Sequence, residues 1–152
     1  MKKLFSILLA TMMVFSMAAC NPAAPPDPIV DPKVQDEEVA AFLYEVVGEI
    51  FIENEVLVFV EDKVAYVDIY QDGMEDDLNA VVRFGDYEPW NDVVALVDVC
   101  SADLHNQLLA QEQEYSVVLS ICEIVDDETV KFISSKDGEP VFNMLVEVLE
   151  SK

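Results

Sequence analysis

The sequence contains few of the residues on which several kinds of active site depend. Only four of its 152 residues are glycine, and none of them lies in a glycine-rich loop that could hold a phosphate group. It has one histidine, His105, and three cysteines, so it offers no histidine and cysteine set with the spacing of a zinc site. These absences argue against a nucleotide-dependent enzyme and against a zinc protein.

Basic residues are also scarce. Eight lysines and arginines stand against 31 aspartates and glutamates, which gives a formal net charge of −23 at pH 7. Nucleic acids and anionic lipid surfaces both require clustered positive charge, so neither is expected as a partner. Hydrophobic residues still make up 53% of the chain, which is too large a share for a disordered acidic tail. The length allows one folded domain besides a leader segment.

The first 20 residues have the layout of a secretory signal. Lys2 and Lys3 precede an apolar run over residues 4–17. This run is too short to cross a hydrocarbon core comfortably, because a membrane-spanning helix needs ~20 apolar residues. It ends in the sequence Met-Ala-Ala-Cys, which closes at Cys20.

This ending resembles the lipobox of bacterial lipoproteins, whose members usually carry leucine at the position of Met17. The resemblance implies that residues 1–19 are a signal peptide that is removed, and that Cys20 then carries diacylglycerol and a further fatty acyl chain such as palmitate. Two or three acyl chains anchor a protein firmly, since each buried CH₂ contributes ~0.8 kcal/mol. The implied location is the outer side of a cell membrane. The alternative is an ordinary secretory signal in which Cys20 occurs by chance.

Residues 20–34 are predicted to be a tether between this anchor and the folded part. Five of the seven prolines of the chain lie in this segment, and they favour extended polyproline II. At ~3.1 Å per residue such a tether would hold the domain up to ~40 Å from the bilayer. Removal of the leader takes away two lysines, so six basic and 31 acidic residues would remain, a net charge of −25.

Residues 35–152 are predicted to form an acidic α+β domain. Apolar spacing of three and four residues predicts helices at 35–51, 89–111 and 144–149. Alternation and β-branched runs predict five or six strands, at residues 55–61, 64–70, 80–84, 114–125, 129–134 and 141–142. An acidic turn is expected at residues 74–79. Since the loops are short, neighbouring strands are expected to pair antiparallel. The predicted fold is an antiparallel sheet of about five strands, with the long helix packed on one face and additional helices at both ends of the domain.

The segment from Trp90 to Asn143 resembles a module of uncharacterised surface lipoproteins of Gram-positive bacteria. In that module a helix led by tryptophan precedes a hairpin with an aspartate-rich turn, here Asp126 and Asp127, and a closing Asp-Gly pair, here Asp137-Gly138. The resemblance implies a location and no activity.

Two cysteines remain after Cys20, and they allow two interpretations. Export would permit a disulfide between Cys100 and Cys122. From the expected turn, however, Cys100 lies ~18 Å back along the helix and Cys122 ~26 Å along the strand. A disulfide requires Cα atoms within about 7 Å. Both residues also lie in apolar stripes, so we favour two buried thiols and leave the disulfide open.

Asp98, Ser101 and His105 follow one another at one-turn spacing on the predicted second helix. They have the residue types of a catalytic triad. A nucleophile, however, needs an oxyanion hole and an exposed, strained position, which a regular helix does not provide. We interpret the three residues as a solvated polar edge beside the apolar stripe.

Two acidic turns are candidate cation sites. The candidate ligands are Asp72, Asp76 and Asp77 in the first turn, and Asp126 and Asp127 in the second. Carboxylate-rich loops suit Ca²⁺, but the spacing is not that of an EF-hand. We therefore interpret these residues mainly as solvated turns and expect no cofactor.

Four aromatic residues are candidates for a ligand surface, namely Tyr66, Tyr70, Tyr87 and Trp90. They are expected to gather where the sheet meets the second helix. Aromatic rings beside carboxylates commonly recognise sugars, peptides or cationic groups. Packing in the core is the alternative.

Together these features predict a non-enzymatic binding domain that is anchored to a membrane and faces away from the cytoplasm. Its acidic surface would suit a basic protein or peptide, or a cationic cell-wall component. One alternative is a small secreted hydrolase with paired carboxylates, which requires a pocket that sets two carboxyl pKa values apart. The other is an inhibitor-like protein-binding domain, which requires a protruding loop with exposed aromatic residues.

Overall fold

A computed structural model of the protein describes residues 32–151, with side chains described from Gln35 onward. The predicted signal peptide 1–19, the predicted lipidation site Cys20 and the tether up to residue 31 lie outside the described residues. The first described helix begins at Pro32, inside the segment that we predicted to be tether. Proline is well tolerated there, because the first turn of a helix does not use its backbone N–H groups.

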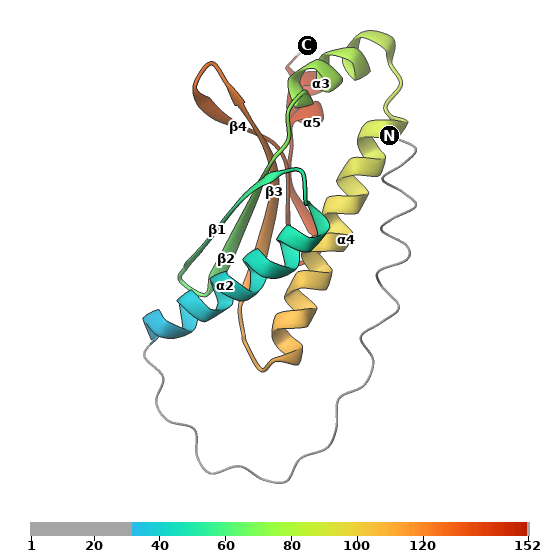
Figure 1. Ribbon diagram of the computed structural model, residues 1–152. Helices are drawn as coiled ribbons and strands as arrows, with labels where there is room; N and C mark the ends of the chain where they lie inside the picture. The colour runs from blue at the N-terminus through green and yellow to red at the C-terminus, as the bar shows by residue number, and fades with distance from the viewer. Residues whose placement is uncertain (1–31, 152) are drawn as a thin grey trace, which may run out of the picture. The chain divides into compact units, whose positions relative to one another are not determined.

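The described part is α+β, as predicted, with four helices and five strands (Figure 1). In chain order the elements are α2 (Pro32–Ile50), β1 (Glu55–Glu61), β2 (Val64–Tyr70), α3 (Met74–Phe84), α4 (Glu88–Ala110), β3 (Ser116–Val125), β4 (Glu128–Lys136), β5 (Glu139–Asn143) and α5 (Met144–Glu150). The long helix α4, the β1–β2 and β3–β4 hairpins and the short last helix match the predicted elements.

The five strands form one sheet in the order β1-β2-β3-β4-β5. Three of the four neighbouring pairs are antiparallel, as predicted, but β2 and β3 are parallel. The prediction was wrong for this pair because residues 71–115 form two helices and lack the strand that we predicted at residues 80–84. They hold α3 and α4, which carry the chain back to the end of the sheet where β2 began.

Residues 74–84 form the helix α3, where we predicted an acidic turn followed by a strand. Three acidic residues lie in the first turn of α3, near the positive end of the helix dipole, and Arg83 lies in the last turn. The carboxylate of Glu123 on β3 accepts hydrogen bonds from the backbone N–H groups of Gly73 and Glu75, at 2.7 and 2.8 Å. The acidic residues of this segment therefore begin a helix instead of forming a loop.

Helices α2 and α4 pack on the same face of the sheet, α2 over β1 and β2 and α4 over β3, β4 and β5. The core between these two layers contains Val39, Leu43 and Val47 of α2, Ala65, Val67 and Ile69 of β2, Val97, Leu104 and Leu108 of α4, and Val117 and Leu119 of β3. Helix α4 is the one described helix long and apolar enough to cross a membrane, a property that core helices share. Its buried side chains face the sheet.

The other face of the sheet is not covered by any described helix. We call it the open face. Side chains alternate along a strand, so the open face carries the residues between the core positions: Leu57 and Phe59 on β1, Tyr66, Asp68 and Tyr70 on β2, Ser120, Cys122 and Ile124 on β3, and Lys131 and Ser134 on β4. On this face Leu57, Phe59 and Ile124 are exposed, whereas Ser120, Cys122 and Ser134 are buried.

Candidate functional site

The four aromatic candidates do not form one cluster, and Trp90 has the alternative fate, packing in the core. Tyr66 and Tyr70 lie on the open face, whereas Trp90 lies in the core on the opposite side of the sheet, with 3% of its surface exposed. The Trp90 indole N–H donates a hydrogen bond to Oδ1 of Asn143, at 2.9 Å. Tyr87 precedes α4 and is partly exposed. Only Tyr66 and Tyr70 remain as candidates for a shared ligand surface.

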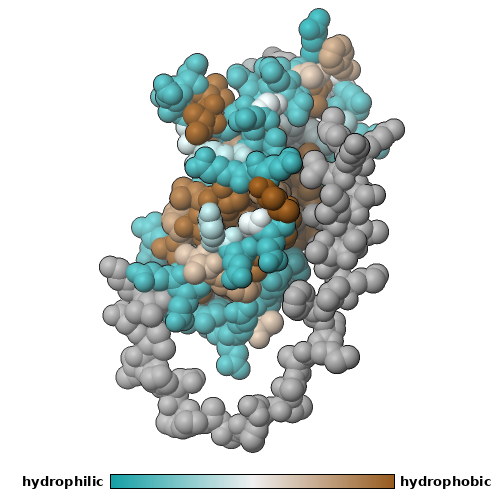
Figure 2. Space-filling view, viewed as in Figure 1, coloured by the Kyte–Doolittle hydropathy of each residue, from teal (hydrophilic) through white to brown (hydrophobic). Residues whose placement is uncertain are grey.

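On the open face, Tyr66 is joined by apolar residues of β1. The rings of Phe59 and Tyr66 stack with centroids 4.8 Å apart and planes 12° from parallel. Leu57 and Phe59 are 49% and 42% exposed, and with Tyr66 they form adjacent apolar and aromatic groups on one face of the sheet. Figure 2, in which α2 faces the viewer, shows apolar surface at mid-height over the β1 edge and the adjacent end of α2, bordered by hydrophilic surface. This half of the open face combines aromatic and aliphatic groups in contact with solvent.

An acidic pocket lies beside the exposed aromatic strip, which is formed by Leu57, Phe59 and Tyr66. The pocket is between the α2–β1 and β2–α3 turns. It has a volume of about 260 Å³ and is lined by Glu53, Asn54, Glu55, Tyr70, Gln71, Asp72 and Ile124. The volume lies below the ~300–1,000 Å³ of typical small-molecule sites, so it fits one side chain or a small group better than a large substrate.

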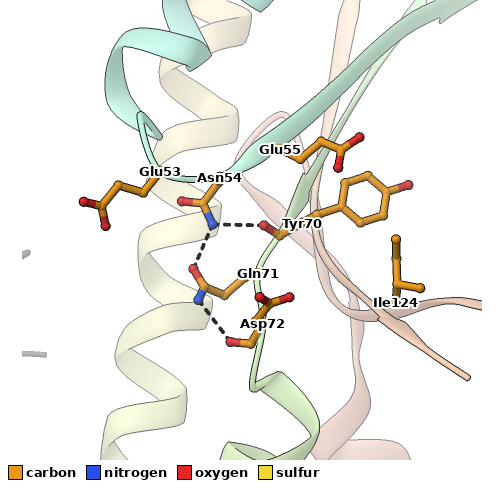
Figure 3. A pocket seen from close by; sticks show the side chains of 7 residues that line it. All are labelled: Glu53, Asn54, Glu55, Tyr70, Gln71, Asp72 and Ile124. Atoms are coloured by element: carbon orange, nitrogen blue, oxygen red, sulfur yellow. Dashed lines mark hydrogen bonds between the residues drawn. The ribbon is translucent and has the colours of Figure 1, made fainter.

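Hydrogen bonds fix the floor of the acidic pocket. Nδ2 of Asn54 donates to the carbonyl oxygen of Tyr70 and to Oε1 of Gln71, at 3.0 and 2.9 Å. Nε2 of Gln71 in turn donates to the carbonyl oxygen of Asp72, at 3.1 Å. In Figure 3 the Glu55 carboxylate, the Tyr70 ring and Ile124 lie on one side of the pocket, and the Glu53 carboxylate points to the other. The two turns are thus held together by hydrogen bonds that do not involve the side-chain carboxylates of Glu53, Glu55 or Asp72.

Lys63 and Lys131, the basic residues nearest in sequence to the pocket residues, make contacts outside the pocket. Nζ of Lys63 donates to the Tyr115 hydroxyl at 2.7 Å and to Oε1 of Gln35 at 3.0 Å, on the side of α2. The Tyr115 hydroxyl donates to Oδ1 of Asp36 at 2.7 Å. Nζ of Lys131 lies 3.9 Å from Oδ1 of Asp68. No lysine or arginine lines the acidic pocket, so its carboxylates have no described cationic partner.

The five candidate cation ligands are not brought together. Asp72 lines the acidic pocket, Asp76 and Asp77 lie in the first turn of α3, and Asp126 and Asp127 form the tight turn between β3 and β4. Among residues 32–151 no group of three histidine, cysteine, aspartate or glutamate side chains is placed to hold a metal ion. The two predicted acidic turns therefore do not make a built cation site.

The Asp98, Ser101 and His105 set is not a solvated edge, and this interpretation was wrong. Ser101 is fully buried, and its hydroxyl bonds to Oγ of Ser135 and to the N–H of Gly138, both at 2.9 Å. Nδ1 of His105 lies 2.8 Å from the carbonyl oxygen of Tyr115, which places a proton on that nitrogen. These contacts join α4 to the β4–β5 turn and to the start of β3, and they leave no free nucleophile.

Cys100 and Cys122 are both free and buried, as we favoured. Cys100 faces the core from α4, whereas Cys122 points from β3 to the open face, so the sheet separates the two thiols. Burial is the main cause that raises the pKa of both thiols, and the pKa of Cys122 reaches about 11 with a smaller contribution from the nearby Asp68 carboxylate.

Within the described part, the clear pKa shifts belong to these two thiols and to Tyr115, whose pKa is raised by burial and by its hydrogen bond to Asp36. None of the three lines the acidic pocket. The β3–β4 hairpin extends past the sheet (Figure 1), but residues 123–129 include no aromatic residue. Neither the hydrolase nor the inhibitor alternative gains support from these features.

No protein-family model, curated protein or solved structure matches this chain. The two resemblances drawn from the sequence therefore stay predictions.

The contribution of β1 to this surface was not predicted from the sequence. Glu55, Leu57, Phe59 and Glu61 share the open face because they are spaced by two residues. We had interpreted residues 55–61 only as an apolar run. The alternation of this run, and the glutamate at each of its ends, are the signal that could have revealed the surface.

Proposed function

We propose that the chain is a lipid-anchored lipoprotein outside the cytoplasm whose acidic domain binds a cationic partner without catalysing a reaction. The partner is a basic protein or peptide, or a cationic component of the cell wall. The signal-like leader and Cys20 support the location. The acidic pocket beside the exposed aromatic strip supports the binding.

The observation that carries the binding proposal is the composition of this corner of the domain. Three carboxylates, a tyrosine ring and an aliphatic side chain line one small cavity, and no basic side chain lines it. An ammonium or guanidinium group would find carboxylate acceptors and an aromatic face together, an arrangement that recognises cations with aliphatic stems.

Binding to an immobilised lysine-rich peptide tests this proposal. The full chain in neutral detergent should be retained at 0.05 M NaCl and released by about 1 M NaCl, because the Debye length falls to ~3 Å at 1 M salt. The double variant Glu55→Gln/Asp72→Asn should elute at lower salt than the control Glu147→Gln/Glu150→Gln, which removes the same charge from α5. Equal elution of the two variants, or retention that ignores salt, would contradict the proposed site.

Metabolic labelling with a fatty-acid probe tests the anchor. The wild-type chain should take up the label and partition into the detergent phase, whereas Cys20→Ser should do neither. An unlabelled wild-type chain that keeps its leader would refute the lipoprotein part of the proposal and leave the binding part standing.

A further inference from the structure

The two edges of the sheet are built differently. At one edge, β5 is five residues long, contains Pro140 and pairs with β4 through a shifted register. Short length, proline and irregular pairing are all devices that keep an edge strand from pairing with another chain. At the other edge, β1 is seven residues long, contains no proline and pairs with β2 in an unbroken register from Glu55 to Glu61. Among residues 32–151 no strand pairs with its outer side.

The β1–β2 turn fixes which backbone groups of β1 face outward. Asp62 and Lys63 form a two-residue turn with φ values of 50° and 62°, so the flanking Glu61 and Val64 are a hydrogen-bonded pair. Bonding alternates along an antiparallel pair, so the N–H and C=O groups of Val56, Val58 and Val60 point away from β2. The hydrogen bond from Ser116 N–H to the Lys63 carbonyl oxygen agrees with this alternation on β2. β1 therefore offers three donor and acceptor pairs to a further strand.

The two glutamates of β1 favour pairing with a basic strand over pairing with an acidic one. Glu55 and Glu61 lie at the two ends of β1 on the open face, with the exposed Leu57 and Phe59 between them. In an antiparallel pairing with a second copy, Glu55 of each chain would lie opposite Glu61 of the other, and opposed like charges destabilise a strand pair. A strand with basic residues at these positions would gain two ion pairs instead.

We propose that β1 binds its partner by strand addition. The partner contributes an extended segment with lysine or arginine opposite Glu55 and Glu61 and apolar residues opposite Leu57 and Phe59. Its seven residues read basic, any, apolar, any, apolar, any, basic, and the four specified side chains lie on the open face. The inference rests on the proposed function in one respect, that the partner is cationic, and it adds the form in which the partner binds.

A matched set of capped heptapeptides tests the strand addition with the full chain in neutral detergent. The first is Lys-Thr-Val-Thr-Tyr-Thr-Lys, which follows the proposed pattern. The second, Thr-Lys-Val-Thr-Tyr-Lys-Thr, has the same composition with both lysines moved to the other face. The third and fourth are the first peptide with N-methyl groups at positions 2, 4 and 6, which would face β1, or at positions 3 and 5, which would face away.

The first peptide should bind at least tenfold more tightly than the second or the third, because these lose ion pairs or backbone hydrogen bonds. The fourth should bind within about twofold of the first. On binding of the first peptide, the amide protons of Val56, Val58 and Val60 should gain protection from hydrogen exchange measured by NMR.

A charge exchange on the protein gives an independent test. Glu55→Lys/Glu61→Lys should lose the first peptide and bind the analogue with glutamate at both ends, whereas Glu147→Lys/Glu150→Lys on α5 should keep the wild-type preference.

The outcomes separate the two proposals. Equal binding of all four peptides that weakens with salt, without added amide protection, would overturn strand addition and leave cation binding intact. The absence of any binding at 0.05 M NaCl would overturn both. Protection of the three outward amides in the free chain would show that another segment or copy already occupies the edge, and would also overturn strand addition by a partner.

Discussion

The replacement of Gly138 by alanine tests the contact between the β4–β5 turn and α4. Gly138 has a φ of +93°, and a Cβ added to it would lie 2.9 Å from Cβ of Ala102 on α4. Its N–H donates to the buried hydroxyl of Ser101, so the turn cannot move away from the helix without loss of that hydrogen bond. The substitution therefore combines backbone strain with a steric clash.

The expected stability loss of Gly138→Ala follows from backbone strain and from the clash with Ala102. A left-handed conformation costs a non-glycine residue roughly 1–2 kcal/mol, and overpacking costs roughly 1–3 kcal/mol. The lower entropy of an unfolded chain with alanine offsets about 0.4–1 kcal/mol. The expected loss in the free energy of unfolding is about 3 kcal/mol, which lowers the thermal midpoint by roughly 10 °C for a domain of this size.

Urea unfolding of a small set of variants separates the two causes. Gly73→Ala has a similar φ of +84° but no atom within 4 Å of the new Cβ, so it should lose only the backbone share. Ala102→Gly removes the clashing atom at ~1 kcal/mol in helix propensity, and combined with Gly138→Ala it should recover about 1–3 kcal/mol relative to additivity. A Gly138→Ala variant as stable as the wild type, or a coupling near zero, would refute the described packing of the turn.

Three further predictions concern single elements. Gly48→Ala on α2, where the new Cβ meets nothing within 4 Å, should raise the free energy of unfolding by about 1 kcal/mol in urea titrations. Glu123→Gln weakens the hydrogen bonds to the N–H groups of Gly73 and Glu75 and should lower the free energy of unfolding by about 1–2 kcal/mol. An unchanged urea midpoint would show that α3 does not need this cap. Because the pKa of Cys122 is about 11 when folded and 9.0 as the ordinary value, the unfolded chain loses this proton first as the pH rises. The contribution of Cys122 to the free energy of unfolding is therefore complete below pH 9 and is lost between pH 9 and pH 11. In unfolding titrations over this range, the free energy of unfolding of Cys122→Ala should fall less steeply than that of the wild type.

Local patterns predicted the elements whose formation depends on nearby residues. The apolar spacing from Trp90 to Leu108 predicted α4, and the two-residue alternation of residues 64–70 predicted β2. The helix α3 was missed because its acidic first turn resembles a loop and its Ala-Val-Val run resembles a strand. The spacing of Met74, Leu78 and Val82 was the available sign of a helix.

Long-range arrangement could not be predicted in the same way. The parallel pairing of β2 with β3 depends on where α3 and α4 return the chain, which no local pattern encodes. The separation of Tyr66 from Trp90 was within reach, since Tyr66 alternates with the core residues of β2. The acidic pocket was not within reach, because Asn54, Gln71 and Ile124 come from three turns or strands that only the fold brings together.

The position of the charges on β1 gives the acidity of this domain a specific use. A lysine or proline in the middle of an edge strand would prevent pairing with any chain. Here the charges stand only at the ends, at Glu55 and Glu61, and the centre of the strand remains able to form a ladder. A second copy of this chain is then rejected both by these two glutamates and by its own net charge. Under the proposed strand addition, this edge would discriminate by charge instead of by shape: it would reject a second copy of the chain and accept basic strands.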